Sequence, residues 1–113
     1  MLMSTLPSMT DYLQVATATA TRDEAIRLVE PIVRGQLAAG AQIIGPVVSA
    51  FWHAGEFGTG EEYRILFKSR SDRYPQLESA IREHHPWDRP EINAVAFTEF
   101  SDEYRDWVDK TLG

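Results

Sequence analysis

The sequence contains no cysteine. It therefore has no disulfide bond, no thiolate metal site and no thiol nucleophile. We therefore expect any metal ion that it binds to be held by imidazole, carboxylate, hydroxyl or carbonyl groups, because the lack of cysteine excludes the soft thiolate sites. Histidine is scarce as well, and two of the three histidines are neighbours, His84 and His85.

Long apolar runs and basic runs are also missing. No stretch approaches the ~18 apolar residues that span a bilayer, and Met1–Ser8 lacks the basic start and apolar centre of a signal peptide. We therefore expect a disordered tail at residues 1–10, a cytoplasmic location and no membrane contact. The formal net charge is −6 and only two of the eleven basic residues are lysines, so we expect no nucleic-acid partner.

The length of 113 residues suits one hydrophobic core, and we expect residues 11–113 to form a single domain. Apolar periods of two and of 3.6 residues predict alternating strands and helices. The expected strands are 12–19, 41–53, 63–68 and 92–98, and the expected helices follow caps at Thr21, at Ser71 or Asp72, and at Ser101. This β-α-β-β-α-β order with an extra C-terminal helix is the ferredoxin-like α+β sandwich.

The first helix has a clear start. Thr21 and Glu24 match a capping box. We expect the helix to run to about Ala39, to stop at Gly40 and to kink at Pro31, because a proline inside a helix removes a hydrogen bond. Its apolar stripe is predicted at Ile26, Val29, Val33 and Leu37.

The segment 41–53 is apolar on both faces of the predicted strand, which indicates that both faces are covered. A domain of this size covers one face with its own helices, so we expect the other face to meet a partner chain. Residues 55–60 are rich in glycine and predict a flexible hairpin loop before the returning strand.

The adjacent histidines close the second helix, which tolerates Pro75 in its first turn and ends before Pro86. Adjacent helical side chains point about 100° apart, so the two imidazoles meet on one ion only if the helix unwinds there. Asp88 or Glu91 could then complete the ligand set. In the alternative interpretation, His84 packs under the helix, on one stripe with Tyr74, Leu77 and Ile81, and His85 caps the last carbonyl groups.

Other candidates lie on turns and strand ends. Trp52 is typical of an interface anchor, Lys68 is either an anion contact or a surface lysine, and Trp87 could shield a pocket beside Glu91. The sequence has no H-E-x-x-H, P-loop or G-x-S-x-G motif, so we expect no enzyme. A histidine acting as acid or base beside an oriented carboxylate ranks last among the hypotheses.

Several segments together resemble one family. In order they are Leu37-Ala38-Ala39, Ser49-Ala50-Phe51-Trp52, Phe67-Lys68-Ser69-Arg70, His85-Pro86-Trp87-Asp88-Arg89-Pro90-Glu91-Ile92, and Tyr104 with Trp107. The chain from Tyr12 to Leu112 resembles the CutA-type divalent-cation-tolerance proteins, and the segment that starts at His85 is the most specific part of the likeness.

The resemblance implies a ferredoxin-like subunit in a non-catalytic homotrimer, similar in architecture to PII signalling proteins, that binds or responds to divalent ions such as copper or zinc. The resemblance also implies a metal site at His84 and His85, and Thr17 stands at the position where some members have a cysteine. The second hypothesis is a PII-like trimer that senses a small molecule or a protein partner through clefts between subunits. Its pocket would be lined by Trp52, Lys68, Trp87 and Glu91.

Overall fold

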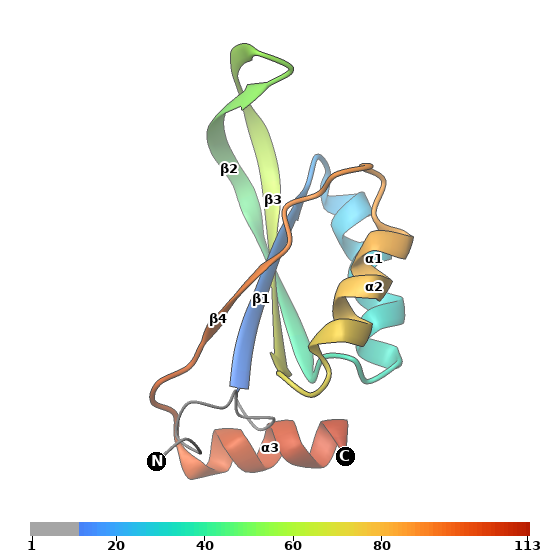
Figure 1. Cartoon of the computed structure of the whole chain (residues 1–113), viewed down its shortest axis with the longest axis vertical. Coiled ribbons are helices and arrows are strands. Elements are labelled where there is room, and N and C mark those ends of the chain that lie inside the picture. Colours follow the sequence, from blue (N-terminus) through green and yellow to red (C-terminus); the bar gives the residue numbers. More distant parts are fainter. Residues whose placement is uncertain (1–11) are drawn as a thin grey trace, which may run out of the picture.

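The computed structural model describes residues 12–113 of the chain, so the tail expected at residues 1–10 lies outside the described residues. Its elements follow the predicted order (Figure 1). They are β1 (Tyr12–Thr19), α1 (Arg22–Arg34), β2 (Gly40–His53), β3 (Glu56–Arg70), α2 (Tyr74–His84), β4 (Asn93–Ala96) and α3 (Asp102–Leu112).

The four strands form one antiparallel sheet in the order β2-β3-β1-β4. The two helices α1 and α2 lie together on one side of this sheet, and α3 lies across its lower end (Figure 1). The ferredoxin-like α+β sandwich with an additional C-terminal helix is therefore confirmed.

The core lies between the sheet and the two helices. Val15 of β1 pairs with Phe67 of β3, so both side chains share the helix-facing side of the sheet. Both are fully buried, as are Leu28 of α1 and Ile81 of α2, which belong to the same cluster. Each such side chain contributes about 1.5–3 kcal/mol through its removal from water. This side of the sheet is therefore complete within one protomer.

The start of α1 is as predicted, but its end and its buried stripe are not. Thr21 and Glu24 form the capping box. The helix runs through Pro31 and ends at Arg34 instead of Ala39, because Gln36 adopts a positive φ of 59° that stops it. The buried stripe is shifted by one residue toward the N-terminus relative to the prediction, because the buried residues are Ala25, Leu28 and Ile32.

Of the glycine-rich segment 55–60, which was predicted to be a hairpin loop, only Gly55 lies in the turn, and β3 begins at Glu56. The turn between β2 and β3 consists of Ala54 and Gly55, both with positive φ, as two-residue hairpins require. Gly58 lies opposite Phe51 in the ladder. A Cβ atom at Gly58 would lie 3.3 Å from the Phe51 ring, so this glycine provides the surface on which the ring rests.

The hairpin of β2 and β3 extends well beyond the helices (Figure 1). In this outer part Val48 is 80% exposed and Trp52 is 75% exposed. Trp52 has an edge-to-face contact with Phe57, at a ring separation of 5.9 Å. The protomer therefore leaves apolar side chains of β2 uncovered, as the two-sided pattern of the sequence predicted.

The later elements differ in their boundaries. The cap of α2 is Arg73, which makes no side-chain capping bond, so the caps predicted at Ser71 or Asp72 are wrong. The carboxylate of Asp72 instead accepts two hydrogen bonds from Arg70. The strand β4 covers 93–96 and not 92–98, whereas Ser101 caps α3 as predicted.

The last helix is tied to the sheet by a buried cation. Arg70 is 8% exposed and contacts both Asp72 and Asp109. The hydroxyl group of Tyr12 also donates to Asp109, at 2.9 Å. Val108 and Leu112 bury their side chains beside these contacts, so α3 closes the lower end of the sheet.

Candidate functional site

The two histidines have opposite environments. His84, the last residue of α2, is exposed, whereas His85 is buried. The interpretation that places His84 under the helix is therefore wrong. His85 takes the inward position instead, because its backbone leaves the helix in an extended conformation (ψ 138°). A residue before proline avoids the α conformation, and this change of direction separates the two imidazole rings.

Both ring nitrogens of His85 have partners. Nε2 lies 2.8 Å from the carbonyl oxygen of Ala18, and Nδ1 accepts the main-chain N–H of Trp87 at 3.1 Å. A carbonyl oxygen only accepts and an amide N–H only donates, so the ring carries its single proton on Nε2. Burial lowers the pKa of His85, which favours the same neutral form. His85 thus holds the loop after α2 against β1.

Thr17 is fully buried on β1. Within residues 12–113, its hydroxyl oxygen has no hydrogen-bond partner. Residues 12–113 contain no group of three His, Asp or Glu side chains placed to hold a metal ion. Because Cu(I) prefers sulfur ligands, the hydroxyl group of Thr17 and one free imidazole do not fit a copper(I) centre.

The loop after α2 is fixed at a second point by Arg64, a residue that sequence reasoning missed. Its guanidinium group binds the carboxylate of Glu91 through two bonds, of 2.6 and 3.1 Å. Asn93 donates a further bond to the same carboxylate, and these contacts with Arg64 and Asn93 lower the pKa of Glu91. The alternation of side chains along β3 was the signal in the sequence that could have indicated this position of Arg64. In the structure Arg64 pairs with Ala18 and lies on the side of the sheet away from the helices.

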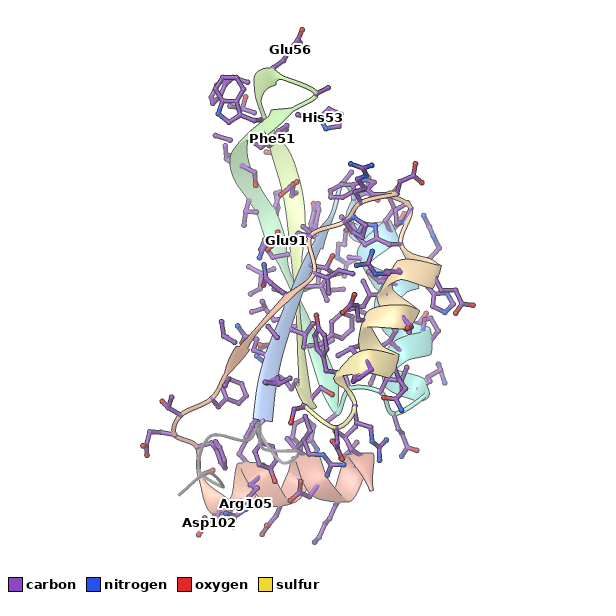
Figure 2. The ribbon with its side chains drawn as sticks, in the orientation of Figure 1. Phe51, His53, Glu56, Glu91, Asp102 and Arg105 are labelled. Atoms are coloured by element: carbon purple, nitrogen blue, oxygen red, sulfur yellow. The ribbon has the colours of Figure 1, made fainter. Side chains whose placement is uncertain are left out.

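The hairpin and this loop border an open hollow of about 960 Å³. Three of the four predicted pocket residues meet there, Trp52, Trp87 and Glu91. Figure 2 shows Phe51 and His53 on the hairpin above Glu91, and both of these residues also line the hollow. A hollow with aromatic walls and a few polar groups is typical of a small-molecule site.

Lys68 lies elsewhere. It lines a smaller hollow of about 370 Å³ at the lower end of the sheet, together with Gln42, Tyr104 and Trp107. Its amino group donates to the side-chain oxygen of Gln14 at 2.7 Å. Within one protomer, the predicted pocket is therefore divided between two places.

A four-stranded antiparallel sheet, two helices on one side and a long projecting hairpin define a ferredoxin-like protein with an uncovered strand pair. The family model described as CutA1 divalent ion tolerance protein matches residues 13–111. The chain belongs to this family.

Known relatives agree with this assignment. The divalent-cation tolerance protein CutA of Thermus thermophilus is 29% identical over 101 residues, which cover 88% of this chain and 98% of that protein. The protein of the same name from Archaeoglobus fulgidus is 28% identical over 90 residues, 80% of this chain and 87% of that one. The solved structure of CutA from Synechococcus elongatus covers 100% of both chains with a TM-score of 0.87 and 26% identity.

Among the helices of the described part, none has both the length and the apolar character that crossing a membrane would require.

Proposed function

We propose that this chain works as a non-catalytic homotrimer of the divalent-cation tolerance type. The observation that carries the proposal is the family match over residues 13–111. The exposed apolar side chains of Val48 and Trp52 support the assembly, because a second copy that covers them removes this surface from water.

Sedimentation equilibrium at micromolar concentration tests the assembly. We expect a single species with three times the mass of the chain, 12.8 kDa. A stable protomer at that concentration would contradict the proposal.

We further propose that a divalent cation, copper or zinc, contacts His84 and His85. His84 is exposed at the end of α2, so its ring is accessible to an ion in solution. His85 has one lone pair, on Nδ1, and the N–H of Trp87 occupies it. A cation at His85 therefore has to displace the loop.

Isothermal titration with Cu(II) and Zn(II) tests the two ligands. We expect His84→Ala and His85→Ala each to weaken binding, and His53→Ala to serve as the matched control that leaves it unchanged. Equal binding by all four proteins would refute the assignment.

A second candidate function is a PII-like trimer that senses a small ligand or a protein partner. The observation that favours it is the hollow of about 960 Å³, in which Trp52, Trp87 and Glu91 lie together. A ligand that binds only the folded protein raises its melting temperature. A metabolite library should therefore yield compounds that stabilise the wild type but not Trp87→Ala, and a library with no such compound would exclude small-molecule sensing through this hollow.

The sequence predicts a cytoplasmic location. The solved structure of the Archaeoglobus fulgidus relative is described as that of a periplasmic protein. Fractionation of cells that express the chain from its own gene would decide between the two compartments.

A further inference from the structure

The smaller hollow lies where α3 meets the first residues of β2 and the end of β3. Its wall includes the backbone of Gly40, and a Cβ atom there would lie 3.1 Å from the ring of Trp107. The indole ring therefore lies directly against the strand. Tyr104, one turn earlier on α3, packs at a ring separation of 5.7 Å from Trp107. Two aromatic rings thus form one side of the hollow.

Lys68 lines this hollow, and its ammonium group has no counter-ion among residues 12–113. Its amino group contacts only Gln14, and no carboxylate of residues 12–113 pairs with it. The two other partly buried cations of the sheet, Arg64 and Arg70, each bind carboxylates. Burial also lowers the pKa of Lys68. An ammonium group that is partly removed from water and lacks a counter-ion is unfavourable, so an anion at this position would stabilise it.

The other polar groups around the hollow also suit an anion. The ammonium group of Lys68 has two protons beyond the one donated to Gln14. Tyr104 and Trp107, which line the hollow, carry an O–H and an N–H donor without a partner among residues 12–113, and the side chain of Gln42 is exposed. Among residues 12–113, no carboxylate lines the hollow, although the whole chain carries a net charge of −6.

We propose that this hollow binds a small organic carboxylate. The carboxylate group pairs with Lys68, and the flat apolar part of the ligand lies against Tyr104 and Trp107. The volume of about 370 Å³ is at the lower end of the range for ligand sites, which suits an acid with a single ring. The site is separate from His84 and His85 and does not depend on cation binding there.

Competitive acetylation of the intact protein tests the site, with benzoate as the probe and benzamide as its uncharged control at constant ionic strength. The chain has two lysines, so Lys110 serves as an internal reference. Mass spectrometry after a short pulse of an acetylating reagent reports both positions. At about ten times its Kd, benzoate should lower acetylation of Lys68 about tenfold and leave Lys110 unchanged, because about one site in ten remains empty. Benzamide should protect neither lysine.

Two variants provide a second measurement. Benzoate should change the tryptophan fluorescence of the wild type and of Lys110→Met, and Lys68→Met should lose this response. If Lys68→Met does not fold, the acetylation of the wild type still decides. Equal protection of Lys68 by benzamide or by inorganic phosphate would overturn the proposed ligand class. A Lys68 that resists acetylation without any added anion would overturn the site itself, because a second copy of the chain would then cover it.

Discussion

Two adjacent histidines with the same side chain have different roles because of one backbone angle. His84 keeps the helical conformation and remains exposed, while His85 turns inward ahead of Pro86 and binds Ala18. The sequence shows that the helix ends here. It does not show which ring is buried, because that depends on the position of β1, which is distant in sequence. The pairing of Arg64 with Glu91 was missed for the same reason.

The neutral state of His85 makes the stability of the fold depend on pH. Burial lowers its pKa below the usual value of about 6.5, so below that pH the unfolded chain binds more protons than the folded one. The contribution of His85 to the free energy of unfolding should therefore be constant above about pH 6.5. It should fall as the solution becomes more acidic. Urea unfolding between pH 8 and pH 5 measures it. His84→Ala should retain this dependence, and His85→Gln should reduce it. Identical curves for His85→Gln and the wild type would contradict the prediction.

The buried hydroxyl group of Thr17 predicts an unusual stabilising substitution. Thr17→Val replaces an unpaired hydroxyl group with a methyl group of similar size, so the free energy of unfolding should rise by roughly 1 kcal/mol. Ser69 is the control, because it is equally buried but donates a hydrogen bond to the carbonyl oxygen of Leu37 at 2.8 Å. Ser69→Ala should therefore destabilise the protein by roughly 1 kcal/mol. Thermal or urea unfolding that gives both substitutions the same sign would refute this reasoning.

At the scale of the elements, two of the three predicted helix caps are confirmed, whereas features that depend on a distant strand were missed. The capping box at Thr21 and the serine cap of α3 depend on residues within one turn, and both are confirmed. The glycines at 58 and 60 indicated a loop, yet they lie in β3 because the ring of Phe51 on the opposite strand occupies the space above them. The residue pattern of one strand does not reveal which side chain lies opposite it on the neighbouring strand.

Glycines of the same hairpin should respond differently to substitution. A Cβ atom at Gly45 would lie 2.7 Å from the ring of Tyr63 and 3.0 Å from the carbonyl oxygen of Glu62. At Gly60 the nearest atom would be 3.9 Å away. Gly45→Ala should therefore destabilise the fold by about 1–3 kcal/mol, as overpacking does, and Gly60→Ala should change it by less than about 0.5 kcal/mol. Chemical denaturation of both variants measures the difference, and equal losses would show that the backbone shifts freely at residue 45.

At the scale of the whole molecule, we expect the uncovered hairpin to decide the proposed assembly. Val48 is 80% exposed within one protomer, and in the proposed trimer it is buried. Val48→Asp should then shift the sedimentation of the protein from trimer toward protomer, because a buried unpaired carboxylate is strongly unfavourable. Ser79→Asp adds the same charge on the exposed surface of α2 and should leave the trimer intact. A trimeric Val48→Asp variant would show that this strand does not lie in the interface.

The hairpin also has a consequence for the chain before the proposed trimer forms. Its strands are joined by a two-residue turn, so the ladder closes with little loss of chain entropy and forms early in folding. Newly synthesised copies therefore display tryptophan and phenylalanine side chains while they are still alone. At high expression we expect such copies to pair with one another in wrong registers, and we expect slower synthesis to increase the yield of the proposed trimer.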